Sequence, residues 1–264
     1  MINNKFPKFI KGNVLTRELL EEVRDYPIDA FNTFLYDYSD GIIKGFELNI
    51  VDEELEISEG IFKLDNKLFI KKDKNILLLP ENPGFYYINM IFTNKKDGDF
   101  DFLSLDIVFS STKAKKNEYE LGRINYIGGK IHCSNNAFED FIKYDSNHIE
   151  IINVKYADIG KYKISNEVLY FFGKALLKKK MIEYSPLDLN FALQAVNKTV
   201  TSDLLIQYIN LKLGKDNDFY SNEEVYNELK KILHNFKPLR YTIEKDSLEN
   251  NNFAKLDQNQ IFVT

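Results

Sequence analysis

The chain has little cysteine, little arginine and no tryptophan, and each shortage argues against a class of function. Cys133 is the single cysteine among 264 residues, which excludes an intrachain disulfide and a cysteine-rich zinc site and suggests a reducing compartment. The 35 basic residues include only four arginines and are outnumbered by 40 acidic residues, which gives a net charge of −5. Nucleic acid is therefore not an expected partner, because binding it requires a basic face. The absence of tryptophan also argues against a surface that binds sugars by aromatic stacking.

Long apolar runs are missing as well. The longest, residues 76–79 and 168–172, are far shorter than the roughly 20 residues of a membrane span. Pro7 lies where a secretory signal peptide would have its apolar core, so no export signal is expected. With 44% hydrophobic and 28% charged residues, the chain has the composition of a folded soluble protein.

Residues 1–40 predict an apolar arm followed by a short helical hairpin. Thr16 is a suitable N-cap for the first helix. Pro27 is expected to end or kink that helix and to open the second one, in which apolar residues recur at helical spacing through Tyr38. A monomer would have to bury the arm, which contains Phe6, Phe9 and Ile10.

Residues 41–131 change to an alternating apolar and polar pattern, which predicts short antiparallel strands. Turn residues separate the runs, for example Asp65-Asn66 between two strands of a tight hairpin. The pattern favours an antiparallel β-sandwich or small barrel. Residues 132–160 are interpreted as a connecting segment that contains one more strand-like run at 149–156.

Residues 161–236 predict a mainly helical domain, and each of its helices has a start signal. Ser165 caps the first, Ser185-Pro186 opens the second, and Thr201 or Ser202 starts the third, which Gly214 closes. The fourth begins with a capping box formed by Ser221 and Glu224. Residues 237–264 form a polar tail with the apolar end Ile261-Phe262-Val263. The expected fold class is thus α+β.

No pattern of catalytic, cofactor-binding or metal-ligating residues emerges. Asp97, Asp99 and Asp101 alternate like the start of a calcium loop, but Phe102 and Val108 replace the glycine and glutamate that such a loop requires. A solvated turn is favoured, with metal binding as the lesser alternative.

Other chemically suggestive residues also have structural explanations. His132 and Cys133 are adjacent on a strand end, so their side chains point apart, while His148 and His234 lack a partner at ligand spacing. Residues 128–130 resemble a hairpin turn more than a phosphate loop. The lysines at 178–180 close a helix, where cations meet the negative end of its dipole. The chain is not expected to be an enzyme or to need a cofactor.

The apolar residues at the two chain ends are the candidate interface. Such clusters usually fray unless something holds them. The candidates are Phe6, Phe9, Ile10, Ile261, Phe262 and Val263.

The β segment resembles a sequence run found near the start of many phage-tail baseplate and tail-fibre attachment proteins. The matching stretches are residues 41–48, 55–62 and 66–70, followed by 77–80, 84–88 and 120–124, in the same order over roughly residues 14–131. Asn66 replaces the usual hairpin glycine, and Gly122 replaces the alanine before Arg123. The helical half carries no such resemblance, so its role is inferred only from its position.

This resemblance implies a structural assembly protein of a contractile phage tail or a phage-tail-like bacteriocin or injection particle. Its place would be in the baseplate or between the baseplate and a receptor-binding fibre. Its partners would be neighbouring baseplate or tail-fibre subunits, with several copies per particle and no small-molecule substrate. The protein would be made in the bacterial cytoplasm without a signal peptide. The alternatives are a carbohydrate-binding module of the same particle or a cell-envelope glycan hydrolase with paired carboxylates.

Overall fold

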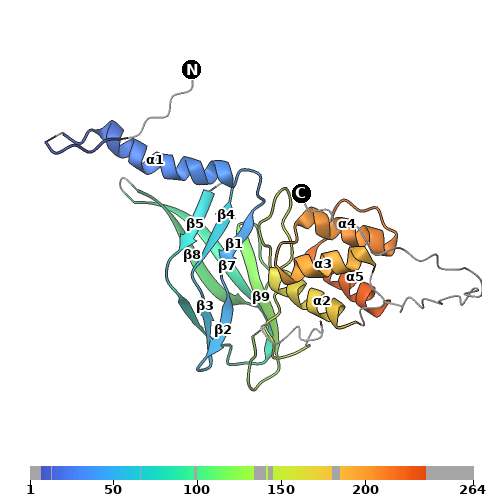
Figure 1. Ribbon diagram of the computed structural model, residues 1–264. Helices are drawn as coiled ribbons and strands as arrows, with labels where there is room; N and C mark the ends of the chain where they lie inside the picture. The colour runs from blue at the N-terminus through green and yellow to red at the C-terminus, as the bar shows by residue number, and fades with distance from the viewer. Residues whose placement is uncertain are drawn as a thin grey trace, which may run out of the picture.

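The computed structural model describes residues 7–12, 14–65, 67–97, 100–133, 141, 145–179 and 185–235, with the backbone alone at 95–97 and 100–102. It has an N-terminal helix, three small antiparallel sheets and a group of C-terminal helices (Figure 1). The expected α+β class is confirmed. The described strands form three separate sheets and close no barrel.

The N-terminal helix α1 (Arg17–Phe34) is continuous, so the expected helical hairpin is wrong. Thr16 caps it as predicted, since its Oγ1 accepts a hydrogen bond from the Leu19 amide at 3.3 Å. Pro27 lies inside the helix. A proline removes one backbone hydrogen bond, but its fixed φ is compatible with a helix, so it can bend a helix without ending it.

The strands form three sheets of three strands each, and all neighbouring strands are antiparallel. The first sheet has the order β1-β4-β5, the second β2-β3-β6 and the third β8-β7-β9. The strands are β1 (Gly41–Gly45), β2 (Leu48–Val51), β3 (Glu54–Ile57), β4 (Gly60–Leu64), β5 (Lys67–Lys71), β6 (Asn75–Leu78), β7 (Gly84–Asp97), β8 (Phe100–Ser110) and β9 (Glu118–Tyr126).

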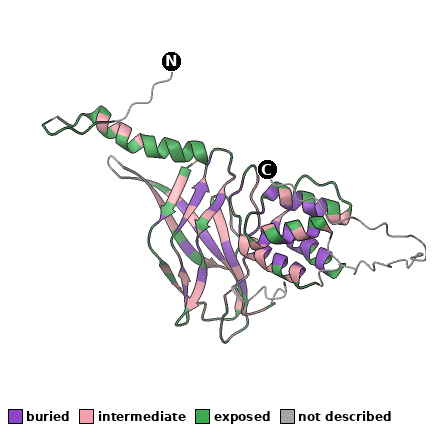
Figure 2. Ribbon diagram, in the orientation of Figure 1, coloured by how far each residue is buried: buried purple, intermediate pink, exposed green. Residues whose placement is uncertain are grey.

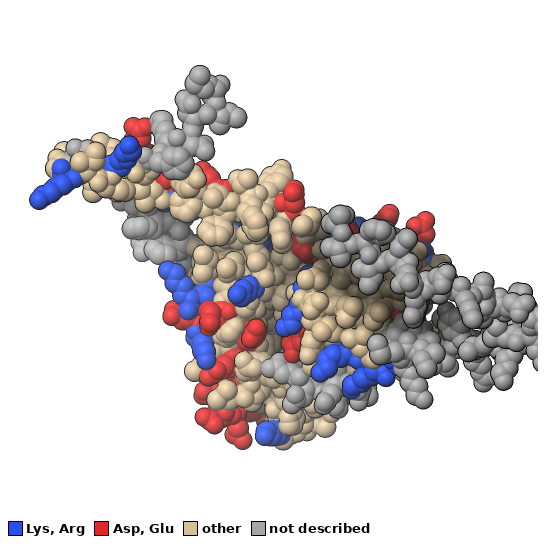
Figure 3. Space-filling view, in the orientation of Figure 1, with Lys and Arg blue, Asp and Glu red and all other residues tan. Residues whose placement is uncertain are grey.

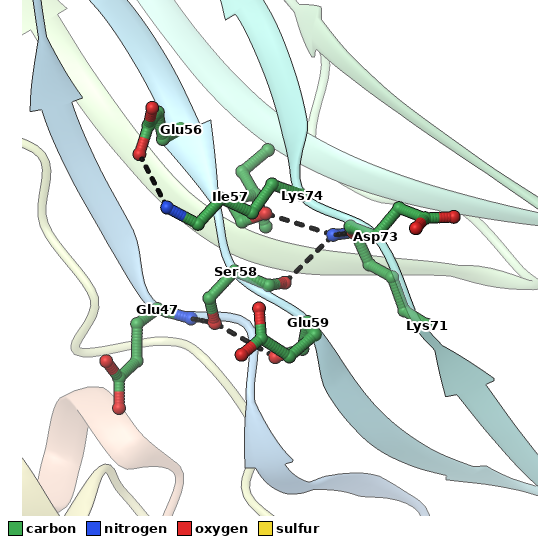
Figure 4. Close-up of polar contacts among 8 residues, drawn as sticks. All are labelled: Glu47, Glu56, Ile57, Ser58, Glu59, Lys71, Asp73 and Lys74. Carbon is green, nitrogen blue, oxygen red and sulfur yellow. Dashed lines mark hydrogen bonds and ion pairs between the residues drawn. The ribbon is translucent and has the colours of Figure 1, made fainter.

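The chain passes between the first two sheets at a common corner, and Lys71 holds this corner together (Figure 4). The Lys71 Nζ donates hydrogen bonds to the carbonyls of Ile57 at 3.0 Å, Ser58 at 2.9 Å and Asp73. Burial lowers the pKa of this ammonium, although the nearby Glu59 and Asp73 oppose the shift. The chain passes between these sheets three times, from β1 to β2, from β3 to β4 and from β5 to β6. Lys71 thus satisfies carbonyls on the second and third of these crossings.

The crossing from β1 to β2 passes so close to the crossing from β3 to β4 that it requires glycine. At Gly45, where φ is +76°, a Cβ atom would lie 2.0 Å from the Glu59 carbonyl oxygen. The Glu47 amide then donates to the Ser58 Oγ at 3.0 Å. The glycine and the serine together keep the β1–β2 and β3–β4 crossings in contact.

The four C-terminal helices begin where their caps predict. They are α2 (Asn166–Lys178), α3 (Pro186–Val196), α4 (Ser202–Leu213) and α5 (Asn222–His234). Their N-caps are Ser165, Ser185, Thr201 and Ser221, and the last forms the predicted capping box with Glu224. Gly214 closes α4 with φ +64°, the conformation that favours glycine.

A single hydrophobic core extends from the sheets into the helices (Figure 2). In the β part, the Phe62 ring lies 5.0 Å from that of Phe92 and 4.6 Å from that of Tyr119. In the helical part, Phe191 of α3 stacks on Tyr208 of α4 with a centroid distance of 3.8 Å.

The strand-like run at 149–156 forms isolated bridges, with Arg123 of β9, with Ile42 of β1 and with Lys163. This segment pairs with a different strand at each bridge, so it forms no ladder of consecutive residue pairs. Its close approach to β9 explains the glycine at position 122, where a Cβ atom would lie 3.0 Å from Ile149 Cγ2.

Candidate interaction surface

The helix α1 is the most exposed apolar element of the described chain. None of its 18 residues, all of which the structure describes, is buried (Figure 2). Figure 1 shows it projecting from the β domain on the side away from α2–α5. Its large exposed side chains are Leu20 (54%), Val23 (45%), Tyr26 (51%), Ile28 (51%), Phe31 (59%) and Phe34 (75%).

Four of these side chains share one face of the helix. At 100° per residue, Leu20, Val23, Phe31 and Phe34 fall within a single arc, while the acidic residues fall on the opposite side. A soluble protein normally packs such a face against its own core. Here the face is presented to solvent.

The exposed area is large for a monomer. A fully buried aromatic side chain covers about 150–250 Å², so Tyr26, Phe31 and Phe34 alone expose roughly 350 Å² at the fractions given above. The aliphatic side chains add to this area. Contiguous apolar patches of this size mark interaction sites on soluble proteins.

The root of α1, defined as residues 35–38 directly after the helix, is held in place although the helix itself is exposed. Leu35, directly after the helix, is only 7% exposed. The Nζ of Lys63, on β4, donates hydrogen bonds to the carbonyls of Tyr36 and Tyr38. Lys63 is itself 4% exposed, and a buried ammonium is stable only where it is hydrogen-bonded. Its position is therefore tied to the α1–β1 connection.

A second set of contacts ties the same connection to the segment before α2. The Ser39 amide donates to the Asp158 carbonyl at 2.9 Å, and the Gly160 amide donates to the Asp37 carbonyl at 2.8 Å. The Asp158 carboxylate in turn accepts a hydrogen bond from the Ser202 amide at the start of α4. The direction in which α1 projects is thus set by both halves of the molecule.

The structure describes only part of the interface expected from the sequence. Phe9 and Ile10 are 62% and 61% exposed, and they precede α1 in the chain. Phe6, Ile261, Phe262 and Val263 lie outside the described residues. The exposed face of α1 was not among the candidate interface residues, which the sequence analysis placed at the two chain ends.

The buried charged groups serve packing. Arg123 binds Glu120 through two hydrogen bonds of 2.7 and 3.0 Å. Burial raises the pKa of Glu120, although Arg123 opposes the shift. On α3, the Asp188 carboxylate accepts hydrogen bonds from Tyr208 at 2.9 Å and from Lys212 at 2.9 Å, which joins α3 to α4.

Two histidines that are distant in sequence come together. The ring of His132 stacks on that of His148 with a centroid distance of 5.0 Å. Sequence spacing gave no sign of this pair, since it depends on the path of the chain between the two residues. In the part of the chain that the structure describes, no group of three His, Cys, Asp or Glu side chains could hold a metal ion. The turn at Asp97–Asp101 lies partly outside the described residues.

No helix in the described part of the chain is long and apolar enough to cross a membrane.

Comparison with known proteins gives weak likenesses. No protein-family model and no curated protein matches the chain. A crystal structure of TssK is similar with a TM-score of 0.37 and 7% sequence identity, over 87% of this chain and 68% of that chain. A chain of the baseplate complex from the type VI secretion system is similar with a TM-score of 0.31 and 8% identity, over 88% of this chain and 100% of that chain. Likeness at this level assigns the chain to no family.

Proposed function

We propose that the protein is a structural assembly subunit of a contractile tail or tail-like particle, placed in the baseplate or between the baseplate and a receptor-binding fibre. The observation that carries the assembly role is α1, whose root is fixed and whose apolar face is exposed. The particle setting is supported by the sequence resemblance over roughly residues 14–131. In this role the β domain holds α1 at a set angle, and α1 docks on a neighbouring subunit.

The energetics of α1 support this role. An isolated helix of about 12–15 residues is marginal in water, and packing usually supplies the missing stability. None of the 18 residues of α1 is buried within the chain. Docking would remove the apolar face from water at a gain of about 25 cal/mol per Å². A neighbouring subunit therefore supplies the packing that this helix lacks.

The test is incorporation into the particle. The double variant Phe31→Asp and Phe34→Asp should fold normally, because both side chains are exposed, but its amount in purified particles should fall at least tenfold by quantitative mass spectrometry. The matched control is Leu211→Asp on α4, where the leucine is 67% exposed. Equal incorporation of the double variant and the wild type would overturn the docking role of α1. Absence of the wild-type protein from purified particles would overturn the setting.

A further inference from the structure

The exposed face of α1 is symmetric about the middle of the helix. A stripe along this face consists of Leu20, Val23, Pro27, Phe31 and Phe34, and all five residues are exposed. Their spacings in the sequence are 3, 4, 4 and 3, so the stripe has the same spacing in both directions. Spacings of 3 and 4 keep residues on one side of a helix, and they are the spacings at which a second helix packs.

This symmetry favours a second copy of α1 as the partner. In two antiparallel copies related by a two-fold axis at residue 27, Leu20 of each copy faces Phe34 of the other, and Val23 faces Phe31. A two-fold contact requires a patch that is complementary to itself. The stripe meets this requirement at every one of its positions, whereas an unrelated partner would not require symmetric spacing.

The facing side chains also match in size. Each large aromatic side chain meets a smaller aliphatic one, so the two ends of the contact fill similar volumes. Pro27 meets its own counterpart at the axis, and Ala30 lies beside it on the helix surface. Small side chains at a crossing let two helix axes approach closely. A parallel pair would instead place Phe31 and Phe34 of both copies together at one end.

The antiparallel pair also covers the exposed apolar residues outside the stripe. Tyr26 and Ile28 flank Pro27, each about 100° around the helix from it. Because both residues lie next to the two-fold axis, each packs beside its own counterpart in the other copy. Farther out, the pairing brings Leu15 of one copy toward Tyr36 of the other, and these two side chains are 59% and 74% exposed.

The charges of α1 are compatible with such a pair. Glu18, Asp25 and Asp29 fall on the side of the helix opposite the stripe. Arg24 borders the stripe and forms an ion pair with Asp25 of its own helix at 2.6 Å. In Figure 3, most of the surface of α1 in view belongs to uncharged residues. Pairing therefore brings no carboxylates of the two copies into contact.

The exposed apolar area is sufficient for a specific contact. It comes from the stripe and from the arm before the helix, in which Phe9, Ile10, Val14 and Leu15 are 59–82% exposed. With side-chain areas of about 60–250 Å², the two parts together expose roughly 650 Å² per copy. Each partner in a standard interface buries about 600–1,000 Å².

We propose that α1 pairs with α1 of a second copy, antiparallel and about a two-fold axis at Pro27. Both copies contribute the same patch, so the contact closes at two copies. The β domains then lie at opposite ends of the helix pair, because each follows the C-terminal end of its own α1. This proposal rests on the docking role of α1 and names its partner.

The first experiment maps the pair by cross-linking the purified full chain. The native cysteine is replaced in Cys133→Ser, and a single new cysteine is then treated with a short bis-maleimide. Pro27→Cys should give a covalent dimer, since residue 27 meets its counterpart. Phe34→Cys alone should not, because its two copies lie about 21 Å apart along the pair. A mixture of Phe34→Cys and Leu20→Cys should give the mixed dimer, identified by its mass.

Sedimentation velocity measures the strength of the same contact. The wild type should form dimers as its concentration rises, and added salt should not weaken them because no ion pair crosses the contact. Pro27→Lys should weaken dimerisation at least about tenfold, since it places two like charges together at the axis. Lysine favours a helix more than proline does, so this loss would not reflect a melted helix. Asn32→Lys, on the far side of α1, is the matched control and should dimerise like the wild type.

A monomeric wild type would overturn the proposal. Cross-linking of Phe34→Cys with itself would also overturn it, because only a parallel pair brings these positions together. The variant Phe31→Asp with Phe34→Asp separates this failure from failure of the proposed function. If the wild type is monomeric and the variant is lost from particles, α1 docks on a different subunit. If the variant is incorporated normally, the docking role of α1 itself is wrong.

Discussion

The ammonium group of Lys63 donates a hydrogen bond to the backbone carbonyl of Tyr38, 25 positions away in the sequence. This contact joins the middle strand of the first sheet to the connection that follows α1. It gives a helix that has no packing of its own a defined direction, because the chain at its base cannot swivel without breaking the bond.

Replacing Lys63 with methionine should loosen the root of α1. The carbonyls of Tyr36 and Tyr38 would lose their donor, at a cost of about 1–3 kcal/mol for a buried unsatisfied acceptor. We expect a lower free energy of unfolding in urea and faster proteolytic cleavage around residues 36–40. Lys67→Met, at an exposed position on the neighbouring strand, is the control. Unchanged cleavage in Lys63→Met would show that other contacts hold the root.

Lys71 should make stability depend on pH in the alkaline range. Its pKa in the folded protein lies below the ordinary value of 10.5 because of burial, so between the two values the unfolded chain binds more protons. The free energy of unfolding therefore rises with pH through that window. Urea denaturation at several pH values between 8 and 10 should show this rise in the wild type.

The variant Lys71→Met isolates this contribution. It should be less stable than the wild type, because the carbonyls of Ile57, Ser58 and Asp73 lose their donor, and its stability should rise less with pH. Lys72→Met, at an exposed neighbouring position, should follow the wild-type curve. An identical pH dependence in Lys71→Met and the wild type would contradict the assignment to Lys71.

Asp188 should be the most sensitive single position of the helical domain. Its side chain is 2% exposed in the ion pair with Lys212, and the Tyr208 hydroxyl donates to it. Truncation in Asp188→Ala removes the carboxylate that accepts hydrogen bonds from Tyr208, Lys212 and Ser185, so we expect a loss of about 2–4 kcal/mol. Chemical denaturation measures this loss, and Asp203→Ala on the surface of α4 should cost far less. A similar small effect of both variants would mean that water replaces the carboxylate.

The sequence predicted the helical half well because its signals are local. A capping serine or threonine, a proline in the first turn and a closing glycine act within one or two turns of the chain, so Ser185-Pro186 and Gly214 mark real boundaries. The hairpin of β4 and β5 was predictable for the same reason.

The features that depend on distant partners were not predictable. Pro27 indicates a helix break, yet α1 continues through it. The periodicity of α1 identifies an apolar face but does not show whether that face is covered. The stacking of His132 on His148 and the corner formed around Lys71 depend on how segments far apart in the sequence pass one another.

The contacts of Asp158 have a mechanical consequence. Its carbonyl binds the connection after α1, its carboxylate binds the first turn of α4, and one unbroken core fills the space between the two halves. A force that pulls on the projecting helix is therefore transmitted to the helices α2–α5 through hydrogen-bonded and close-packed groups. In a particle that contracts, such a subunit would pass displacement from one neighbour to the next instead of absorbing it.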